Sequence, residues 1–301
     1  MENVIEKNEQ LLNNVLDVMN RYKLNWDVKK VPLFTNEESG SLPTGSYGIF
    51  RSDNNAWLST QGKNYVPLQN FDLVSSVITA SQNIREFDLE EVRAGQLSQG
   101  KKIYVQLPME DEEIGNSKVN RWITALNSHD GSSCVAFGSQ QTVVICQNTF
   151  FKAYKNLTHV RHNMNAKDKL MAMATDLNNS LLEDKLLTEQ FKRWVDMPVT
   201  PNQIEVIKKS IVSLTEEKEG EKISMRKQNQ LIKIERAIEQ EFSLEGENLW
   251  GLFNGVTRYT NHNMFPSKSR EDIKESLMVG QGARINRSAF NQIELFANSM
   301  N

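Results

Sequence analysis

Cysteine is scarce in this sequence. Its 301 residues include two cysteines, Cys134 and Cys146, too few for the disulfide framework of many secreted proteins. They flank one predicted hairpin and could face each other, but their number is more typical of a protein from a reducing compartment. So few thiols also exclude a zinc cluster held by cysteine ligands.

Long apolar runs and a strong net charge are absent as well. No stretch approaches the ~18 apolar residues of a membrane span, and the acidic, amphipathic N-terminus lacks the pattern of a secretory signal. A cytoplasmic protein is therefore expected. The composition, 39% hydrophobic and 24% charged, is that of a soluble globular protein. Since the formal net charge is only −3, any nucleic-acid binding must come from a local basic face.

Signatures of nucleotide hydrolysis and of nucleophilic catalysis are missing. The segment GQGARIN (280–286) has neither a preceding strand nor the lysine of a phosphate loop, and it predicts a flexible turn. Ser128, His129 and Asp130 are consecutive, and adjacent side chains diverge, so these three cannot form a hydrolase triad. Cys146 ends an apolar run, which favours a buried structural cysteine over a nucleophile.

Apolar periodicity in the first part of the chain predicts helix, hairpin and helix. Residues 3–23 have helical spacing, and 26–34 alternate as an edge strand containing a proline. In 46–60, two β-rich runs flank Asp53-Asn54-Asn55, residues that tolerate the left-handed conformation of a tight turn. Residues 68–80 return to helical spacing, with Asn70 or Asp72 as the expected helix start.

Strand patterns continue to about residue 150. Residues 89–109 predict two strands, and residues 121–150 predict three, with turns at 127–133 and 138–141. In the first of these turns Asp130-Gly131 supplies positive φ at low cost. We expect the neighbouring His129 and Asn127 to pin that turn.

The second half is helical in pattern, with a break near residues 163–165. Asn148 and Thr149 are expected to cap a helix that begins near Phe150. Thr200 before Pro201 predicts another helix start. The later helices are expected over 202–214, 222–243, 248–265 and 285–299.

These patterns predict an α+β fold. An antiparallel sheet of hairpins with a packed helix occupies the N-terminal half, and the C-terminal half is helical. The expected division is an N-terminal helix over residues 1–25, a mixed α+β sheet domain over 26–162 and a helical region over 163–301.

Basic residues interleave with aromatic residues on the strand-rich part of the chain. Such groups can form an electrostatic groove with stacking platforms for a single strand, or a solvated rim around a sheet whose aromatics lie in the core. For the first alternative, the residues expected to contact phosphates are Lys63, Lys101, Lys102, Lys152, Lys155 and Arg161. Those expected to stack on bases are Tyr65 and Tyr104.

A metal-dependent enzyme is the alternative from another functional class. His159 and His162 have the i,i+3 spacing that places two imidazoles on one helical face, and with His129 and Asp130 they could bind a divalent metal. No HExxH or facial-triad spacing supports this site, and a His-Asp-Gly segment is often only a turn. No cofactor is therefore expected.

Several landmarks resemble one protein family. The segments LNSHDGSS, VVICQNTF, VRHN and GLFNGVTRYTNH, together with NYVPLQNFDLVSSV and RAGQLSQGKKIYVQL, are similar in order to the phage/plasmid-like proteins grouped as "domain of unknown function 932". The phage setting implies DNA replication, recombination or host takeover in a bacterial cytoplasm. The order of hairpin, strand and helix is also similar to phage annealing proteins of the Red-beta and ERF kind, which hold single-stranded DNA as rings or filaments.

The resemblance implies a homo-oligomer that binds single-stranded DNA and promotes annealing or recombination. A third possibility is an interaction protein that binds a host factor. That function predicts an exposed apolar patch on the helical half, near Trp194 or Trp250, although both tryptophans could equally belong to the core.

Overall fold

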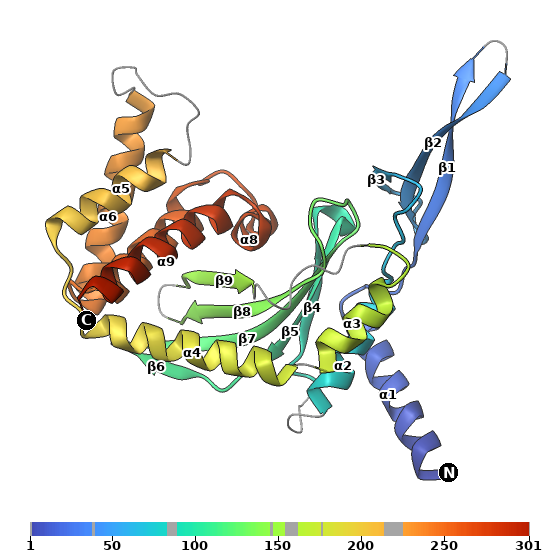
Figure 1. The fold of residues 1–301 in the computed structure, drawn as a ribbon, viewed down its shortest axis with the longest axis horizontal. Coiled ribbons are helices and arrows are strands. Elements are labelled where there is room, and N and C mark those ends of the chain that lie inside the picture. The colour runs from blue at the N-terminus through green and yellow to red at the C-terminus, as the bar shows by residue number, and fades with distance from the viewer. Residues whose placement is uncertain are drawn as a thin grey trace. The chain divides into compact units, whose positions relative to one another are not determined.

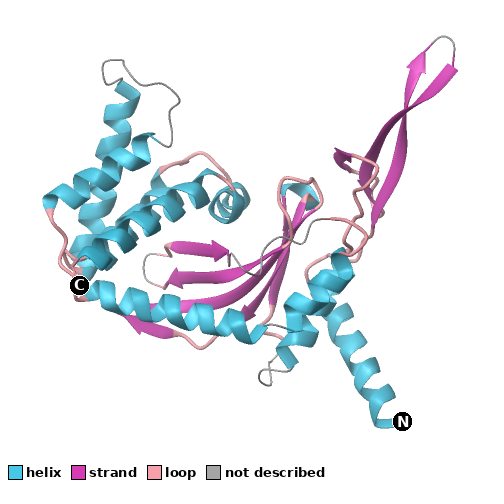
Figure 2. Cartoon of the chain, viewed as in Figure 1, coloured by secondary structure: helices cyan, strands magenta, loops and turns pink. Residues whose placement is uncertain are grey.

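The structure is a computed structural model that describes residues 2–37, 40–82, 89–144, 147–153, 162–175, 177–213 and 225–300. The chain forms two compact units. Unit 1 comprises Met1–Pro108, Trp122–Ser139 and Ala153–Glu183, and unit 2 comprises Met109–Arg121, Gln140–Lys152 and Asp184–Asn301. The fold is α+β, as predicted, with strands mainly in the first half and helices in the second (Figures 1 and 2).

The elements of unit 1 follow the predicted order of helix, hairpin, helix and strands. They are α1 (Glu2–Arg21), β1 (Val28–Glu37), β2 (Gly40–Arg51), β3 (Trp57–Gln61), α2 (Asn70–Gln82), β4 (Arg93–Leu97), β5 (Lys102–Pro108) and α3 (Ala166–Thr175). Strands β1, β2 and β3 form an antiparallel three-stranded sheet in that order. Helix α1 packs on α2, whose apolar positions Leu73, Val74, Val77 and Ile78 are buried.

The second sheet has the order β4-β5-β7-β8-β9, and β6 pairs with β7. Its remaining strands are β6 (Glu112–Ile114), β7 (Ser117–Ser128), β8 (Ala136–Val143) and β9 (Thr149–Ala153). The turn between β7 and β8 carries the His129-Asp130-Gly131 segment, and Gly131 has φ +72°, as the prediction of an Asp-Gly turn requires. The turn predicted at 138–141 is wrong, because these residues lie inside β8.

The helices of unit 2 surround an aromatic core. They are α5 (Pro201–Ser213), α6 (Met225–Glu245), α7 (Leu249–Arg258), the π-helical segment Tyr259–Asn263, α8 (Arg270–Val279) and α9 (Gln281–Ser299). Helix α4 (Leu177–Val195) enters unit 2 at Asp184. Phe150 packs edge-on against Phe253, with ring centroids 5.0 Å apart. Trp194 and Trp250 are 1% and 2% exposed, so they belong to this core and form no surface patch.

Two helix starts in unit 2 test the capping predictions. The start at Thr200-Pro201 is confirmed: Thr200 Oγ1 accepts from Gln203 N at 3.4 Å, and Gln203 Oε1 accepts from Thr200 N at 2.8 Å, which is a capping box. The cap at Asn148-Thr149 is wrong, because Thr149 begins strand β9. Asn148 instead donates through Nδ2 to the buried carboxylate of Glu241 at 3.0 Å.

The segment GQGARIN is also not the flexible turn that its composition suggests. Gly280 separates α8 from α9, and residues 281–286 form the first turns of α9. A side chain at Gly280 would meet the backbone of Ser276, four positions earlier in α8, at 2.8 Å, so the path of the chain out of α8 favours glycine there.

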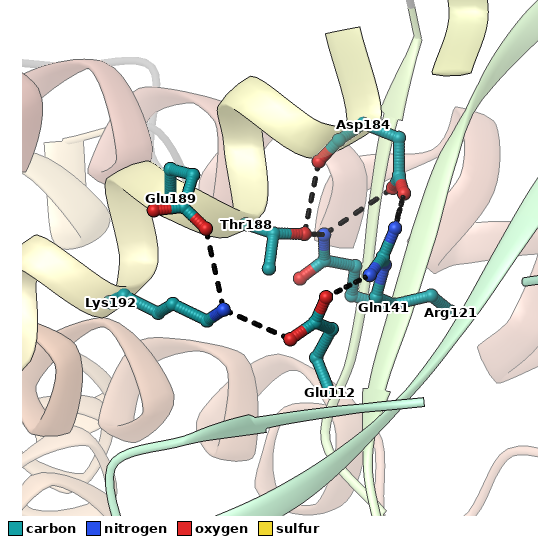
Figure 3. Close-up of polar contacts among 7 residues, drawn as sticks. All are labelled: Glu112, Arg121, Gln141, Asp184, Thr188, Glu189 and Lys192. Carbon is teal, nitrogen blue, oxygen red and sulfur yellow. Dashed lines mark hydrogen bonds and ion pairs between the residues drawn. The ribbon is translucent and has the colours of Figure 1, made fainter. Parts of the chain in front are cut away.

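A buried polar network joins α4 to the strands of unit 2 (Figure 3). Arg121 on β7 donates through Nε and Nη2 to Asp184 Oδ2 at 3.0 and 2.6 Å, and through Nη1 to Glu112 Oε1 at 2.9 Å. Gln141 on β8 donates to Thr188 Oγ1 at 3.1 Å. The Asp184 side chain is completely buried and that of Arg121 is 8% exposed, so this ion pair is a structural tie.

Within the described residues, none of the helices is long and apolar enough to cross a membrane.

Candidate nucleic-acid interface

The candidate interface is one face of the three-stranded sheet in unit 1. The antiparallel register sets Lys29 opposite Phe50, and Phe50 opposite Trp57. Directly opposed residues point to the same side of a sheet. Lys29 and Trp57 are exposed, and Phe50 is half-buried. We call this solvent-facing surface the outer face; it consists of the side chains of Lys29, Phe50, Trp57 and Thr60.

Trp57 reaches the outer face because strand β3 contains a bulge. The register between β2 and β3 shifts between Ile49 and Phe50, which leaves Leu58 as an extra residue in β3. In a regular strand Trp57 and Ser59 would point to the same side. Here Leu58 and Ser59 are 2% and 6% exposed, whereas Trp57 is 55% exposed. The bulge therefore turns the indole outward, which is a known role of β-bulges.

A cation lies beside this exposed indole. Lys101 Nζ is 5.4 Å from the centroid of the Trp57 ring, within the range of a cation–π interaction. Lys29 supplies a second exposed cation on the same face. A flat ring next to ammonium groups can stack an unpaired base while the cations contact the neighbouring phosphates.

The inner face of the same sheet is held by the turn between β7 and β8. Ser59 Oγ donates to the backbone oxygen of His129 at 3.0 Å, and Gln61 Nε2 donates to that of Asp130 at 3.0 Å. The Tyr65 hydroxyl also donates to the His129 oxygen, at 3.3 Å. The turn therefore holds the inner face of the sheet in place.

The side chain of His129 anchors this turn in the core. It is fully buried, its Nε2 lies 2.9 Å from Asn70 Oδ1, and its ring packs against the edge of Trp26 with centroids 5.5 Å apart. Asn70 Nδ2 donates to the backbone oxygens of Leu24 and Trp26, both at 3.1 Å, so Asn70 Oδ1 is left to accept. His129 Nε2 therefore carries the ring proton. Burial lowers the pKa of His129 to about 3, so the ring is neutral.

A second buried histidine lies next to the first. His162 stacks on Tyr65 with ring centroids 5.0 Å apart, and neither of its ring nitrogens has a hydrogen-bond partner among the described residues. Burial lowers the pKa of His162 to about 4, and burial also raises the pKa of Tyr65 above its usual value. Since His162 covers one face of Tyr65, this ring is less suited to stacking on a base than Trp57.

Asp130 pins the turn through its own carboxylate. It forms an ion pair with Lys102 Nζ at 2.9 Å and accepts from the backbone nitrogen of Ser132 at 2.9 Å. Burial alone would raise the pKa of Asp130, but the bonds from Lys102, Ser128 and Ser132 outweigh burial and hold this pKa well below its usual range. The sequence predicted that His129 and Asn127 would stabilise the turn. It did not predict that the Asp130 carboxylate would do so.

The residues predicted to contact DNA occupy several environments. Lys63 is exposed and Lys101 is half-buried beside Trp57, whereas Lys102 is 4% exposed and faces Asp130. Tyr104 lies on β5 opposite Gly95, where a side chain on the glycine would meet the Tyr104 hydroxyl at 2.6 Å. Among these four described residues, Lys101 is the one whose side chain lies beside an outer-face residue, Trp57.

The remaining predicted contacts are Lys152, Lys155 and Arg161. Lys152 belongs to unit 2, with its Nζ 4.3 Å from the centroid of the Phe290 ring. Lys155 and Arg161 lie outside the described residues, as does Cys146.

Sequence reasoning missed all four residues of the outer face: Lys29, Phe50, Trp57 and Thr60. The cross-strand position of Lys29 and Phe50 follows from the predicted hairpin, so their pairing could have been found. The outward direction of Trp57 could not, because it depends on the bulge.

The alternative metal site gains no support. Among the described residues, no group of three or more His, Cys, Asp or Glu side chains could hold a metal ion. His159 lies outside those residues. Asp130 forms an ion pair with Lys102, and His129 Nε2 is hydrogen-bonded to Asn70. Both side chains therefore already have structural partners.

Comparison with known families gives one result. The family model described as Domain of unknown function (DUF932) matches residues 57–289, which include Trp57, Lys101 and the β7–β8 turn. No curated protein and no solved structure matches the chain.

Proposed function

The chain belongs to the family Domain of unknown function (DUF932), and from its geometry we propose that it binds single-stranded DNA on the outer face of unit 1 and promotes strand annealing as a homo-oligomer. In this proposal Trp57 stacks on a base, while Lys101 and Lys29 contact the flanking phosphates. No cofactor takes part.

The observation that carries the proposal is the exposure of Trp57 beside a cation. The other four tryptophans are at most 7% exposed, whereas more than half of the Trp57 side chain faces solvent. A bulge places this large ring in solvent beside a cation, and an exposed apolar surface can mark an interaction site. Bases provide flat apolar partners, and the adjacent ammonium suits a phosphodiester.

Two substitutions on the outer face should weaken DNA binding. Trp57→Ala should lower the affinity for a fluorescently labelled single strand by about 1–3 kcal/mol, the usual contribution of one stacked base. Lys101→Glu should weaken binding to all sequences alike and reduce the dependence of affinity on salt between about 50 and 200 mM. Fluorescence anisotropy measures both effects.

The controls are one exposed apolar residue and one exposed lysine in unit 2. Leu186→Ala removes an apolar side chain that is 57% exposed, and Lys209→Glu reverses an exposed charge. Neither should change the affinity beyond a factor of about two. Equal losses in the control and outer-face variants would contradict the assignment of the interface.

The annealing part of the proposal rests on the resemblance expected from the sequence, in which a hairpin, a strand and a helix succeed one another as in phage annealing proteins; β2, β3 and α2 follow in that order here. Complementary strands labelled with donor and acceptor dyes should anneal faster with the protein than without it, and Trp57→Ala should lose this acceleration. If the protein binds single strands but does not accelerate their annealing, the binding part of the proposal stands and the annealing part is contradicted.

A further inference from the structure

We infer that the His129-Asp130 turn is a clamp that sets the spacing between Trp57 and Lys101, and that His129 is a positioning residue for the outer face. The inference rests on the proposed function for its biological purpose. Its structural content is that one turn holds both Trp57 and Lys101 in position, and this can be tested without DNA.

The backbone of His129 contacts both sides of the pair. Its N–H donates to the backbone oxygen of Lys101 at 2.7 Å. Its carbonyl accepts from Ser59 Oγ at 3.0 Å, and Ser59 lies two residues after Trp57 on β3. One peptide segment therefore joins the strand that carries the indole to the residue that carries the ammonium.

Neighbouring bonds strengthen both arms of the clamp. Gln61 Nε2 donates to Ser59 Oγ at 3.1 Å and to the Asp130 oxygen at 3.0 Å, so two positions of β3 are tied to the turn. On the other arm, the Lys102–Asp130 ion pair holds Lys102 inward. Lys101 directly precedes Lys102 and follows the 3₁₀ turn Ser98–Gly100, so its backbone is held next to this fixed side chain.

The side chain of His129 keeps the turn from moving. Its ring is fully buried and bonded to Asn70, and Asn70 is itself tied to the backbone oxygens of Leu24 and Trp26. A positioning role explains why a buried polar side chain stands at the tip of a turn, where an exposed residue is the usual choice.

Ser59→Ala tests the clamp with little change in volume. In the wild-type chain the side-chain methylene protons next to Lys101 Nζ should show a ring-current shift in NMR spectra, since they lie near the Trp57 ring; Trp57→Phe identifies that signal. Ser59→Ala should move this shift toward the value of an exposed lysine, and Ser59→Thr, which keeps the hydroxyl, should restore it. Ser41→Ala, at an exposed position of β2 outside the outer face, is the matched control.

The same variants give a second readout through DNA. Ser59→Ala removes the bond to the His129 oxygen and the bond accepted from Gln61 Nε2, and should lower single-strand affinity about three- to tenfold, with recovery in Ser59→Thr. An unchanged Lys101 shift together with unchanged affinity in Ser59→Ala would overturn the clamp. If instead the wild-type chain shows the Lys101 shift, loses it in Ser59→Ala and binds no single strand, the clamp stands and the proposed function fails.

Discussion

Replacing Arg121 by leucine should lower the free energy of unfolding of unit 2 by about 3–5 kcal/mol. Arg121 gives Asp184 two hydrogen bonds from its guanidinium, and both side chains are almost completely buried. Leucine leaves the Asp184 carboxylate buried without those bonds, and an uncompensated buried charge is far more costly than the loss of a surface ion pair.

The double variant Arg121→Leu/Asp184→Leu separates charge from packing. Removing both partners eliminates the unpaired charge, so stability should return to within about 1–2 kcal/mol of the wild type. The urea midpoint of unit 2 is followed by pulsed hydrogen exchange of peptides from α4. Lys192→Gln, which breaks the more exposed pairs with Glu112 and Glu189, should cost less than about 1 kcal/mol. A double variant no more stable than Arg121→Leu would show that the loss comes from packing.

Acidification should destabilise unit 1 well above the pH at which carboxylates titrate. The pKa of His129 is about 3 and that of His162 about 4 in the folded chain, whereas an unfolded histidine has a pKa near 6.5. Below about pH 6.5 the unfolded state therefore binds more protons than the folded state, and stability falls as the pH falls. The loss ends near the folded pKa values.

The size of this loss follows from the two protons. Between pH 7 and about pH 4.5 it should reach about 3–5 kcal/mol, because each histidine contributes about 1.4 kcal/mol per pH unit in this window. After burial, the groups that act on the His129 pKa are His162, which lowers it, Asp130, which raises it, and Arg51, which lowers it; the Val66 backbone and Asp130 raise the pKa of His162. Since the pKa of Asp130 is held low, its own contribution is lost only at more acidic pH.

His162→Phe isolates half of the effect. Phenylalanine keeps a ring beside Tyr65 and has no proton to bind, and the His162 nitrogens have no hydrogen bonds to lose among the described residues. The acid-induced loss in unit 1 should shrink by roughly half, while stability at pH 7 is kept. The urea midpoint, followed by hydrogen exchange of α2 peptides, measures it. His262→Gln, on the surface of unit 2, is the control, and the same pH dependence in all three chains would contradict the assignment.

Local sequence patterns predicted most elements of unit 1. Helical spacing placed α1 and α2, and the Asp53-Asn54-Asn55 turn placed β2 and β3, because these signals depend on residues a few positions apart. Asn55 has φ +55°, as such a turn requires. The family resemblance is also confirmed, while its phage setting and its likeness to annealing proteins stay predictions.

The errors arose where distant residues decide the outcome. The segment 138–141 looks like a turn because it is polar, but Gln141 is buried in β8, where Thr188 on α4 accepts its amide proton. Asn148 looks like a helix cap, but its partner is Glu241, 93 positions away. A long-range partner can satisfy a buried polar side chain, and periodicity contains no information about such partners.

The candidate interface was predictable only in part. The expected cluster of cations and rings on the strand-rich half correctly included Lys101 beside the exposed indole. It also included the neighbouring Lys102, which forms a buried ion pair with Asp130 instead. The stacking residues were expected to be Tyr65 and Tyr104, and Tyr65 stacks on His162 instead. Trp57 could not be chosen from alternation, since the bulge at Leu58 reverses its side.

Intrinsic tryptophan fluorescence tests the central claim most directly, because Trp57 is the one strongly exposed tryptophan. Titration with a short oligothymidylate should quench and blue-shift the solvent-exposed part of the emission, and added salt should reverse the change. In Trp57→Phe the titration should leave the emission unchanged. Wild-type emission that does not respond to the oligonucleotide, or a response that persists in Trp57→Phe, would contradict DNA binding on the outer face.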